Sequence, residues 1–370
     1  MLSAPSVIQD EFGPQQLLDV YDAKTGMEGV LVIDNTALGP GKGGIRLVHD
    51  VTVEEVCRLA RAMTWKNALA GLPFGGAKAG IRADHSKPGK AMLVKAFADK
   101  IRAFIPKYFV AGPDMNTTED EMAAFAEEVG SPRSCTGKPL ALGGLPHELG
   151  STGFGVFVAA SAALRHGGLS LQGASVAIEG FGNVGVFSAH YLSRAGARIV
   201  AVSDSKGAAY DARGLDVSKL EEFKRRKGSV TAYPGAKAIP KDGLFGLPVD
   251  VLIPGARPDS IHDGNKRAVK ARVIVEAANV PISEKIELEF HERGVLVVPD
   301  IVANAGGVIS SYVETRGGTP ESMFRKVDAT ISANTERVLE LAESNGVAPR
   351  SAALGLAVSR VRSAMRGRRG

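Results

Sequence analysis

Three lysines stand where an ammonium group is unusual unless it binds something. Lys42 and Lys78 lie in the glycine-rich stretches GPGKGG and FGGAKAG, and Lys66 shares a predicted helical face with apolar residues. A buried ammonium group must bind an anion or lose its proton. Several in one pocket suit a dicarboxylate, and their repulsion and desolvation lower the pKa of at least one lysine, which can then act as a base. The alternative is that each lysine is solvated at the surface.

Asp114 is the candidate partner for proton transfer. It follows Gly112-Pro113 and precedes a predicted helix that Thr118 and Glu121 can cap. A carboxylate at this position can carry protons during a reaction. The alternative is structural, because the N-terminus of a helix favours an acidic residue through its dipole.

A dinucleotide-binding turn is predicted in the stretch EGFGNVG. Its G-x-G-x-x-G stands between a predicted strand, 175–179, and a predicted helix, and the following strand ends at Asp204. In this arrangement the glycines permit the tight turn, the approach of a pyrophosphate and the packing of helix on strand. A glycine-rich turn that binds nothing is the alternative. The candidate cofactor-binding residues are Gly180, Phe181, Gly182, Asn183, Val184 and Gly185.

The residues after this turn leave the choice between NAD and NADP open. Asp204 suits the ribose 2′-hydroxyl of NAD. Ser205 and Lys206 follow at once and can receive the 2′-phosphate of NADP. We therefore expect activity with both cofactors.

Further cofactor contacts are expected at the ends of three later apolar strands. These strands are predicted over 249–253, 272–275 and 295–298, and each ends in small or polar residues. Ligands bind at the carboxyl ends of parallel strands, although a turn asparagine can also simply bond its own backbone. The candidates are Ala256, Asn279 and Asn304.

Two domains are needed to position these residues. The chain has 370 residues, which is long for one core. Residues 16–148 mix short strands and helices, residues 150–310 alternate apolar strands with helical stretches, and the pattern after 320 is helical. We predict an α/β fold with a substrate domain over 1–148 and a Rossmann-like NAD(P)-binding domain over 149–331.

Composition excludes several classes of protein. The two cysteines form no cluster, which argues against a disulfide scaffold or a metal site and fits a reducing, cytoplasmic compartment. We find no signal peptide and no apolar stretch of transmembrane length. The net charge of +5 comes largely from arginines after residue 359, which we interpret as suiting the dipole of a last helix. We expect no nucleic-acid partner and no membrane partner.

The motifs together resemble a known family. The stretches GPGKGGIR, MTWKNALAGLPFGGAKAG, AGPDMNT, TGKPLALGG, STGFGV, EGFGNVG, VSDSKG, EAANVP and PDIVANAGGVISSYVE occur in this order between about residue 20 and residue 365. They look like the glutamate/leucine/phenylalanine/valine dehydrogenase superfamily, and most of all like its glutamate branch. The resemblance implies NAD(P)-dependent deamination of L-glutamate to 2-oxoglutarate and ammonia, and the reverse reaction.

The resemblance also implies roles for single residues. Lys78 becomes the catalytic lysine that activates water and stabilises a carbinolamine, and Asp114 becomes the general acid/base. Lys66 matches the lysine that binds the α-carboxylate. Lys42 and Ser311 match the positions that bind the side-chain carboxylate in the glutamate branch.

The family pattern further implies that Thr152 lies near the nicotinamide and that the C-terminal helices, 332–370, pack back on the first domain. It implies a homo-oligomer, a hexamer by analogy. Three departures from the pattern are Glu148, often an arginine, Phe154, and Val280 in AANVP, where glycine is usual. Two alternatives stay open: a leucine, valine or phenylalanine dehydrogenase, and an inactive nucleotide-binding regulatory protein.

Overall fold

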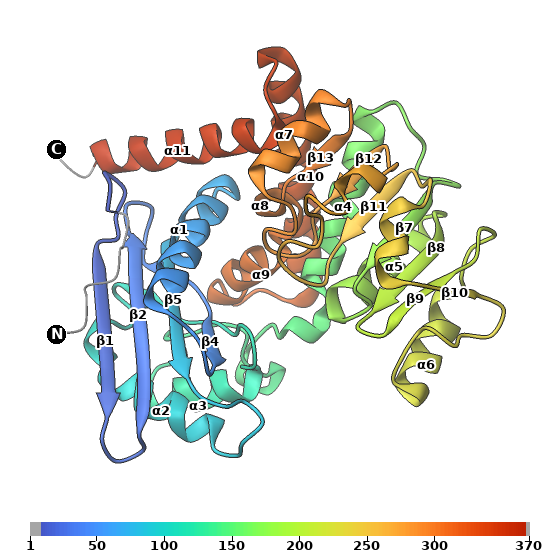
Figure 1. The fold of residues 1–370 in the computed structure, drawn as a ribbon. Coiled ribbons are helices and arrows are strands. Elements are labelled where there is room, and N and C mark those ends of the chain that lie inside the picture. Colours follow the sequence, from blue (N-terminus) through green and yellow to red (C-terminus); the bar gives the residue numbers. More distant parts are fainter. Residues whose placement is uncertain (1–8, 368–370) are drawn as a thin grey trace. The chain divides into compact units, whose positions relative to one another are not determined.

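The computed structural model describes residues 9–367, which divide into two compact units (Figure 1). Residues 1–8, where we expect no signal peptide, and 368–370, which include two of the tail arginines, lie outside the described residues. Unit 1 comprises the described parts of Met1–Leu149, Val308–Met323 and Leu356–Gly370; unit 2 comprises Gly150–Gly307 and Phe324–Gly355.

A mixed sheet of six strands forms the centre of unit 1 within the described residues. Its order is β1-β2-β5-β3-β6, and β4 also pairs with β5. β1, β2 and β5 are antiparallel neighbours, whereas β3 lies parallel between β5 and β6. The strands are β1 (Gln16–Asp22), β2 (Met27–Asn35), β3 (Gly41–Lys42), β4 (Ile45–Val48), β5 (Gly75–Arg82) and β6 (Phe109–Val110).

Helices cover both faces of this sheet because β2 is apolar on both faces. Val30 clusters with Val56 of α1 (Val53–Leu69), whereas the next residue, Leu31, clusters with Phe97 of α2 (Lys90–Lys100). Successive side chains of a strand point to opposite faces, so the two helices lie on opposite sides. The remaining helical elements of unit 1 are η1 (Arg102–Phe104), α3 (Glu119–Val129), η2 (Leu140–Leu142) and η3 (His147–Leu149).

The capping pair Thr118 and Glu121, predicted above, and the pair Thr52 and Glu55, which has the same spacing, differ in outcome. At α3 both halves form, because Thr118 and Glu121 bond each other's backbone N–H groups. At α1 the Thr52 hydroxyl accepts the N–H of Glu55 at 3.2 Å, but the Glu55 carboxylate pairs with Arg46 instead of returning to Thr52. The charge of Arg46 therefore draws Glu55 away from the cap, which matters for the site described below.

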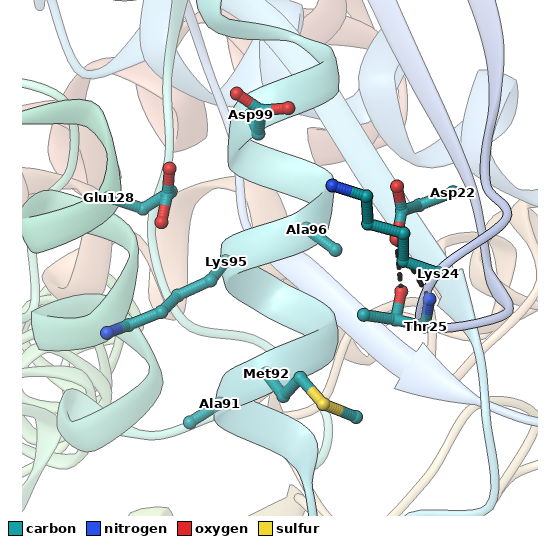
Figure 2. Close-up of a pocket in the computed structure, with 9 residues that line it drawn as sticks. All are labelled: Asp22, Lys24, Thr25, Ala91, Met92, Lys95, Ala96, Asp99 and Glu128. Atoms are coloured by element: carbon teal, nitrogen blue, oxygen red, sulfur yellow. Dashed lines mark hydrogen bonds between the residues drawn. The ribbon is translucent and has the colours of Figure 1, made fainter.

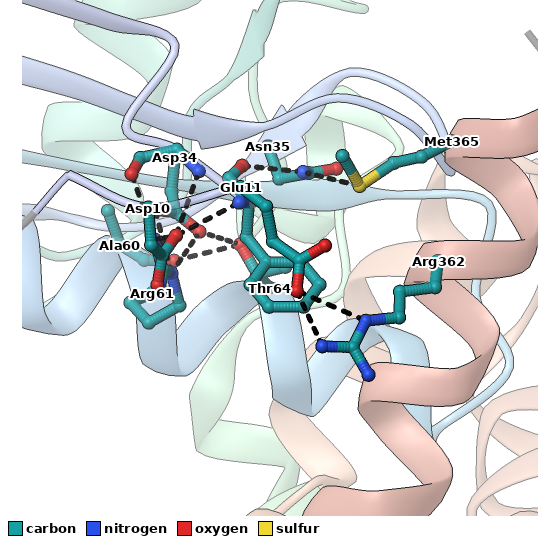
Figure 3. A network of polar contacts seen from close by, with 11 residues as sticks. Asp10, Glu11, Asp34, Asn35, Ala60, Arg61, Thr64, Arg362 and Met365 are labelled. Carbon is teal, nitrogen blue, oxygen red and sulfur yellow. Dashed lines mark hydrogen bonds and ion pairs between the residues drawn. The ribbon is translucent and has the colours of Figure 1, made fainter. Parts of the chain in front are cut away.

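A polar network joins the start of the described chain to the sheet and to α1 (Figure 3). Arg61 of α1 donates to Asp34 at 2.9 Å and to Asp10 at 2.7 Å, and Thr64 also donates to Asp34. Burial raises the pKa of Asp34 in spite of these donors. Arg362, near the end of α11 (Pro349–Gly367), pairs with Glu11 in the same region.

The basic tail has a partner that the sequence did not indicate. Arg360 donates to the carbonyl oxygens of Ala68 and Leu69, at 2.9 Å and 2.5 Å. These carbonyls end α1, so this arginine serves the C-terminus of α1 rather than that of its own helix.

Unit 2 is built on a sheet of seven strands in the described chain, in the order β10-β9-β8-β7-β11-β12-β13. The five strands from β8 to β13 are parallel, as predicted, and β9 and β10 add an antiparallel edge that the sequence analysis missed. The strands are β7 (Ser175–Glu179), β8 (Arg198–Asp204), β9 (Gly207–Tyr210), β10 (Lys237–Ile239), β11 (Val251–Pro254), β12 (Val273–Val275) and β13 (Leu296–Val298).

The helices of unit 2 connect and cover this sheet (Figure 1). They are α4 (Ser151–His166), α5 (Asn183–Arg194), α6 (Val217–Lys227), η4 (Lys241–Gly246), η5 (Lys266–Ala268), α7 (Glu284–Glu292) and α8 (Asp300–Ala303). The helices α9 (Gly306–Thr315), α10 (Pro320–Asn345) and α11 each contribute residues to both units.

The structure divides the C-terminal segment 332–370, which we expected to lie wholly on the first domain. Residues up to Gly355 belong to unit 2. There Glu336 of α10 pairs with Arg165 of α4 at 2.8 Å, and Arg350 at the start of α11 is buried between three carboxylates. These carboxylates belong to Glu276, Glu287 and Asp300. Only the part from Leu356 onward lies in unit 1.

Candidate active site

Lys78 and Asp114 meet in unit 1. Lys78 lies in β5 and is 6% exposed, and its Nζ is 2.9 Å from Oδ2 of Asp114, which follows β6. The same oxygen accepts Nε of Arg46 at 3.0 Å. Sequence reasoning missed Arg46, although it is the last residue of the GPGKGGIR stretch and therefore close to Lys42 in the chain.

The two cations determine the charge of Asp114. Burial alone raises the pKa of this carboxyl group, but the Lys78 ammonium and the Arg46 guanidinium outweigh it, and the net pKa lies below the usual value. Asp114 is therefore an anion at neutral pH, held 2.9 Å from a lysine. Such a pair can exchange a proton once a substrate approaches and changes the local charge.

Lys42 is almost completely buried beside this pair. It ends β3, is 3% exposed, and donates from Nζ to the carbonyl oxygen of Ala111 at 2.8 Å. Gly112 allows this approach, because a side chain there would begin 2.5 Å from the ammonium nitrogen. Burial lowers the pKa of Lys42 to about 7, against partial compensation from the charge of Glu314. The predicted depression of a lysine pKa thus occurs at Lys42, and desolvation is its main cause.

Ser311 reaches the same region of unit 1 through Thr136. The Thr136 hydroxyl donates to Ser311 Oγ at 3.0 Å and lies 3.7 Å from the point where a side chain on Gly112 would begin. Lys42 and Thr136 therefore flank one glycine, and Ser311 is the next polar group. Thr136 was not predicted, although it stands in the quoted stretch TGKPLALGG.

A buried carboxylate fixes the helix that carries Ser311. Glu314 of α9 accepts the backbone N–H groups of Gly137 and Leu145, both at 2.8 Å, and pairs with Lys138. Three donors from residues 137–145 thus bind one carboxylate of α9, and they set the position of Ser311 one turn earlier. Lys66 lies on the buried side of α1, 8% exposed, as its helical spacing predicted.

The dinucleotide turn of unit 2 has three glycines with three different surroundings. Gly180 has φ +92, in the left-handed region that glycine adopts without strain. A side chain at Gly185 would begin 1.9 Å from the carbonyl oxygen of Gly180, so only glycine allows this packing. At Gly182 a side chain would meet no described atom within 4 Å.

This turn fits a dinucleotide. Gly182 and Asn183 are exposed at the start of α5, and no side chain caps this helix. Its first N–H groups are therefore available to an anion, which is how helix N-termini hold a pyrophosphate. Phe181 is buried and Val184 half-buried, so these two side chains support the turn rather than face a ligand.

Asp204 ends β8 beside this turn, but its oxygens already have partners. Oδ1 accepts the N–H of Lys206 at 2.8 Å, and Oδ2 accepts the N–H of Val230 at 2.7 Å. Ser205 and Lys206 are exposed. A second cation, Lys224 of α6, donates to the carbonyl oxygen of Phe181 and was missed because it lies 43 residues beyond this residue in the chain.

The remaining predicted cofactor residues also lie in unit 2. Asn304 Nδ2 donates to Asn279 Oδ1 at 3.1 Å and to the carbonyls of Ala277 and Ala278, so the two asparagines are neighbours. Ala256 is exposed after β11. Thr152 lies half-buried in the first turn of α4.

The three departures from the family pattern are found in different settings. Glu148 is exposed. Phe154 packs edge-on against Tyr191 and Phe324, with ring centroids 4.9 Å and 5.1 Å away. Val280 is 47% exposed and has φ +49, a left-handed backbone that β-branched residues rarely adopt.

A hollow of about 510 Å³ lies between the β1–β2 turn and α2, and none of the predicted site residues line it (Figure 2). Asp22, Lys24 and Thr25 line one side of it, and Met92 and Ala96 of α2 line the other. Among residues 9–367, no group of histidine, cysteine and acidic side chains could hold a metal ion. No helix in that range is long and apolar enough to cross a membrane.

Two family models match the chain. The model described as Glutamate/Leucine/Phenylalanine/Valine dehydrogenase matches residues 143–369, and the Glu/Leu/Phe/Val dehydrogenase, dimerisation domain, matches residues 14–131. Glutamate dehydrogenase of Thermotoga maritima is 40% identical over 351 residues, 90% of this chain and 84% of the relative. NADP-specific glutamate dehydrogenase of Saccharolobus shibatae is 41% identical over 294 residues, 76% of this chain and 69% of the relative.

Solved structures are similar over nearly the whole chain. The leucine-bound crystal structure of hetero-hexameric glutamate dehydrogenase from Thermus thermophilus is 32% identical, with a TM-score of 0.86, and the match covers 96% of this chain and 90% of that one. L-tryptophan dehydrogenase from Nostoc punctiforme is 27% identical, with a TM-score of 0.74, and covers 96% of this chain and 98% of its own.

Proposed function

Because the chain belongs to the glutamate/leucine/phenylalanine/valine dehydrogenase family, we propose that it catalyses the NAD(P)-dependent oxidative deamination of L-glutamate to 2-oxoglutarate and ammonia, and the reverse reaction. The observation that carries the choice of glutamate is Lys42, a lysine 3% exposed whose neighbours include Thr136 and, beyond it, Ser311. A buried ammonium group beside hydroxyl donors suits a side-chain carboxylate.

The residues of unit 1 divide the work on the substrate. Lys66 binds the α-carboxylate, and Lys42 with Ser311 binds the side-chain carboxylate. Lys78 orients the water that attacks the imino carbon and stabilises the oxygen as charge develops on it. Asp114 accepts and returns the protons of that step, because its lowered pKa leaves it ionised beside Lys78.

The residues of unit 2 hold the cofactor. When bound, the nicotinamide supplies the acceptor for the hydride that leaves the substrate Cα. The N–H groups at the start of α5 would hold its pyrophosphate, and Gly182 leaves the space for it. Asn279 and Asn304 offer amide groups at the carboxyl edge of the sheet. Thr152 and Ala256 are the other residues of unit 2 to which we assign a cofactor contact. The division into a substrate domain and an NAD(P)-binding domain follows from these assignments.

The assembly we propose is a homo-oligomer, a hexamer by analogy, in the cytoplasm. The matched dimerisation-domain model supports an assembly of several subunits, and the hetero-hexameric Thermus thermophilus relative supports the number six. Light scattering of the purified protein tests it, and a monomer at micromolar concentration would contradict it.

A second candidate activity is the same reaction on an apolar amino acid. The similarity to L-tryptophan dehydrogenase and the leucine-bound relative give reason to test it. The deciding experiment is the absorbance of reduced nicotinamide with glutamate, leucine, valine, phenylalanine or tryptophan as substrate. A higher kcat/KM with any apolar amino acid than with glutamate would overturn the proposal, and no turnover with any of them would favour an inactive binding protein.

A further inference from the structure

We propose that Arg350 is a positioning residue for the nicotinamide half of the cofactor: through two buried carboxylates it holds segment 276–280 in place, and with it the amides of Asn279 and Asn304. The inference rests on the proposed function, because it explains how the cofactor contacts assigned there are oriented. Replacing Arg350 should therefore affect binding of the nicotinamide more than binding of the ADP-ribose part of the cofactor.

Arg350 binds three carboxylates of unit 2 at once. It lies at the start of α11 and is almost completely buried. Its guanidinium nitrogens are 2.8 Å from Glu276, 2.6 Å from Glu287 and 2.9 Å from Asp300. One carboxylate is enough to neutralise a guanidinium, so charge alone does not account for the other two.

This cluster is costly, which argues against a purely stabilising role. Burial and the charges of Glu287 and Asp300 raise the pKa of Glu276 well above its usual value, although the Arg350 guanidinium opposes this shift. Buried charges lose their hydration, and a buried ion pair is often no more stabilising than apolar residues of similar volume. The position that the cluster gives to the backbone around it is therefore the better account of its presence.

Two of the carboxylates hold the two ends of segment 276–280. Glu276 follows β12, and the oxygen that accepts from Arg350 also accepts the backbone N–H of Asp300 at 3.0 Å. Asp300 pairs with Arg350 through Oδ1 and accepts the backbone N–H of Val280 at 3.0 Å through Oδ2. The first and last residues of the segment are thus held by carboxylates that share one guanidinium.

Asp300 connects this cluster to both candidate asparagines. Asn279 directly precedes Val280, and the backbone N–H of Asn304 donates to the carbonyl oxygen of Asp300 at 3.1 Å. The side chain of Asn304 in turn donates to Oδ1 of Asn279 at 3.1 Å. Val280 has φ +49, and a strained backbone of this kind persists only where its surroundings hold it. A shift of Asp300 would therefore move both amides.

The strand order of unit 2 assigns this segment to the nicotinamide half of the cofactor. The dinucleotide turn follows β7, and β8 lies on one side of β7, whereas β11, β12 and β13 lie on the other. In this fold the acid that ends the second strand takes the adenosine ribose, and the dinucleotide crosses the sheet at the reversal of strand order. Asp204 ends β8. The opposite side, which contains β12 and segment 276–280, is therefore the side of the nicotinamide.

The experiment compares NADH with ADP-ribose, the same molecule without its nicotinamide ring, by isothermal titration of the full-length protein. Where the wild type prefers NADPH, NADPH and 2′-phospho-ADP-ribose replace this pair. Arg350→Lys keeps the charge but loses the planar set of donors that reaches three carboxylates. Asp300→Asn has the same shape but loses an acceptor for either Arg350 or the Val280 N–H.

We expect the wild type to bind NADH more tightly than ADP-ribose. Arg350→Lys and Asp300→Asn should each weaken NADH roughly three- to tenfold, the range for a lost hydrogen bond, and ADP-ribose by less than about twofold.

Two other variants serve as controls. Arg165→Lys makes the same exchange in an exposed pair, with Glu336, that contains no residue of segment 276–280. It should bind both ligands as the wild type does. Phe245→Leu removes volume from the buried core of unit 2. It should lower the midpoint of thermal unfolding and leave the ratio of the two affinities unchanged, which separates lost orientation from lost stability.

Three results would overturn the inference. The first is equal weakening of NADH and ADP-ribose in both Arg350→Lys and Asp300→Asn, as a general loosening of unit 2 would produce. The second is unchanged NADH affinity in both variants, and the third is a wild type that binds the two ligands equally. A wild type that binds neither NADH, NADPH nor ADP-ribose would overturn the proposed function as well. Asp300→Asn keeps the test decisive should Arg350→Lys not fold.

Discussion

The site of unit 1 and the turn of unit 2 use different physical means. In unit 1 the candidate residues are charged side chains removed from water: Lys42, Lys66 and Lys78 are all less than 9% exposed. At the turn of unit 2 the candidate contacts are backbone N–H groups, and the defining residues are glycines that leave space. Burial of charge changes pKa values and the energy of ionic transition states, whereas an open backbone sets only where a ligand can lie.

This contrast separates the effects of mutations. Replacing a charged residue of unit 1 should change turnover, substrate choice and pH dependence but not cofactor affinity. Replacing a residue of the turn in unit 2 should change cofactor affinity but not the preference between substrates. Each prediction below tests one side of that separation.

Lys78→Ala should have the largest effect. The substitution removes the partner of Asp114. General acid–base groups contribute about 10²–10⁴-fold to a rate, so kcat should fall by about 10²-fold or more. NADH affinity, measured by fluorescence titration, should stay within about threefold of wild type. Retention of a tenth or more of the wild-type kcat would show that Lys78 is not catalytic, and a large loss of NADH affinity would break the separation between the two sites.

Lys42→Leu should change substrate choice. Loss of a charge-assisted hydrogen bond costs about 1.5–3 kcal/mol, so kcat/KM for glutamate should fall roughly ten- to a hundredfold. The rate with leucine should fall less or rise, because no unpaired ammonium remains. The ratio of kcat/KM for glutamate to that for leucine is the measurement. An unchanged ratio would mean that Lys42 does not bind the side-chain carboxylate.

The same variant has a pH signature. The pKa of Lys42 is lowered by burial to about 7, from 10.5 for an ordinary lysine, so between these values the unfolded chain holds a proton that the folded protein has released. The free energy of unfolding contributed by this site therefore rises with pH over that window. Below pH 7 Lys42 is charged in the folded protein as well, so the full cost of burying the charge is present there. Urea unfolding should show Lys42→Leu gaining most over wild type near pH 6 and least near pH 10. A gain that does not change with pH would contradict the buried charge.

The two sites also differ in how much of them the sequence revealed. The turn of unit 2 was predicted residue by residue, because the glycine spacing, the flanking strand and the acid are all local. The lysines and Asp114 were predicted too, but Arg46, Thr136 and Glu314 were not. Their roles depend on contacts such as Thr136 with Ser311, 175 residues apart, which no local pattern encodes.

The fold shows the same limit. Thr52 and Glu55 satisfied the capping pattern, yet Glu55 pairs with Arg46, because a nearby cation outcompetes a backbone N–H. β9 and β10 were missed because each is short and lies at the antiparallel edge, where the apolar signal is weak. Residues 332–355 have an amphipathic pattern that requires an apolar surface but does not say which unit provides it.

Gly182→Val tests the turn of unit 2 with a smaller effect. A side chain at Gly182 would meet no described atom within 4 Å, so the folded protein should lose little stability. The space is where a pyrophosphate would lie, so NADH affinity should fall by about tenfold or more, since a clash removes phosphate contacts worth more than 1 kcal/mol. The glutamate-to-leucine ratio should not change. Unaltered NADH affinity would show that the cofactor does not pass over Gly182.

Val280→Gly is expected to have the smallest effect and concerns strain. Val280 has φ +49, and a left-handed backbone costs an L-residue roughly 1–2 kcal/mol. Its N–H donates to Asp300 Oδ2 at 3.0 Å and its carbonyl accepts from Asp259, so the backbone is held there by bonds that glycine keeps. The side chain is 47% exposed, so little burial is lost, while the greater freedom of glycine in the unfolded chain subtracts about 0.5–1 kcal/mol. We expect a net gain in unfolding free energy of about 0.5–1 kcal/mol by urea titration.

The same variant also tests cofactor binding, because Val280 follows Asn279, a candidate cofactor contact. Its NADH affinity shows whether the strained backbone contributes to binding. Unchanged affinity would mean that the valine only costs stability, whereas weaker binding would mean that its exposed side chain contacts the cofactor, in contrast to the turn, where the contacts are backbone N–H groups.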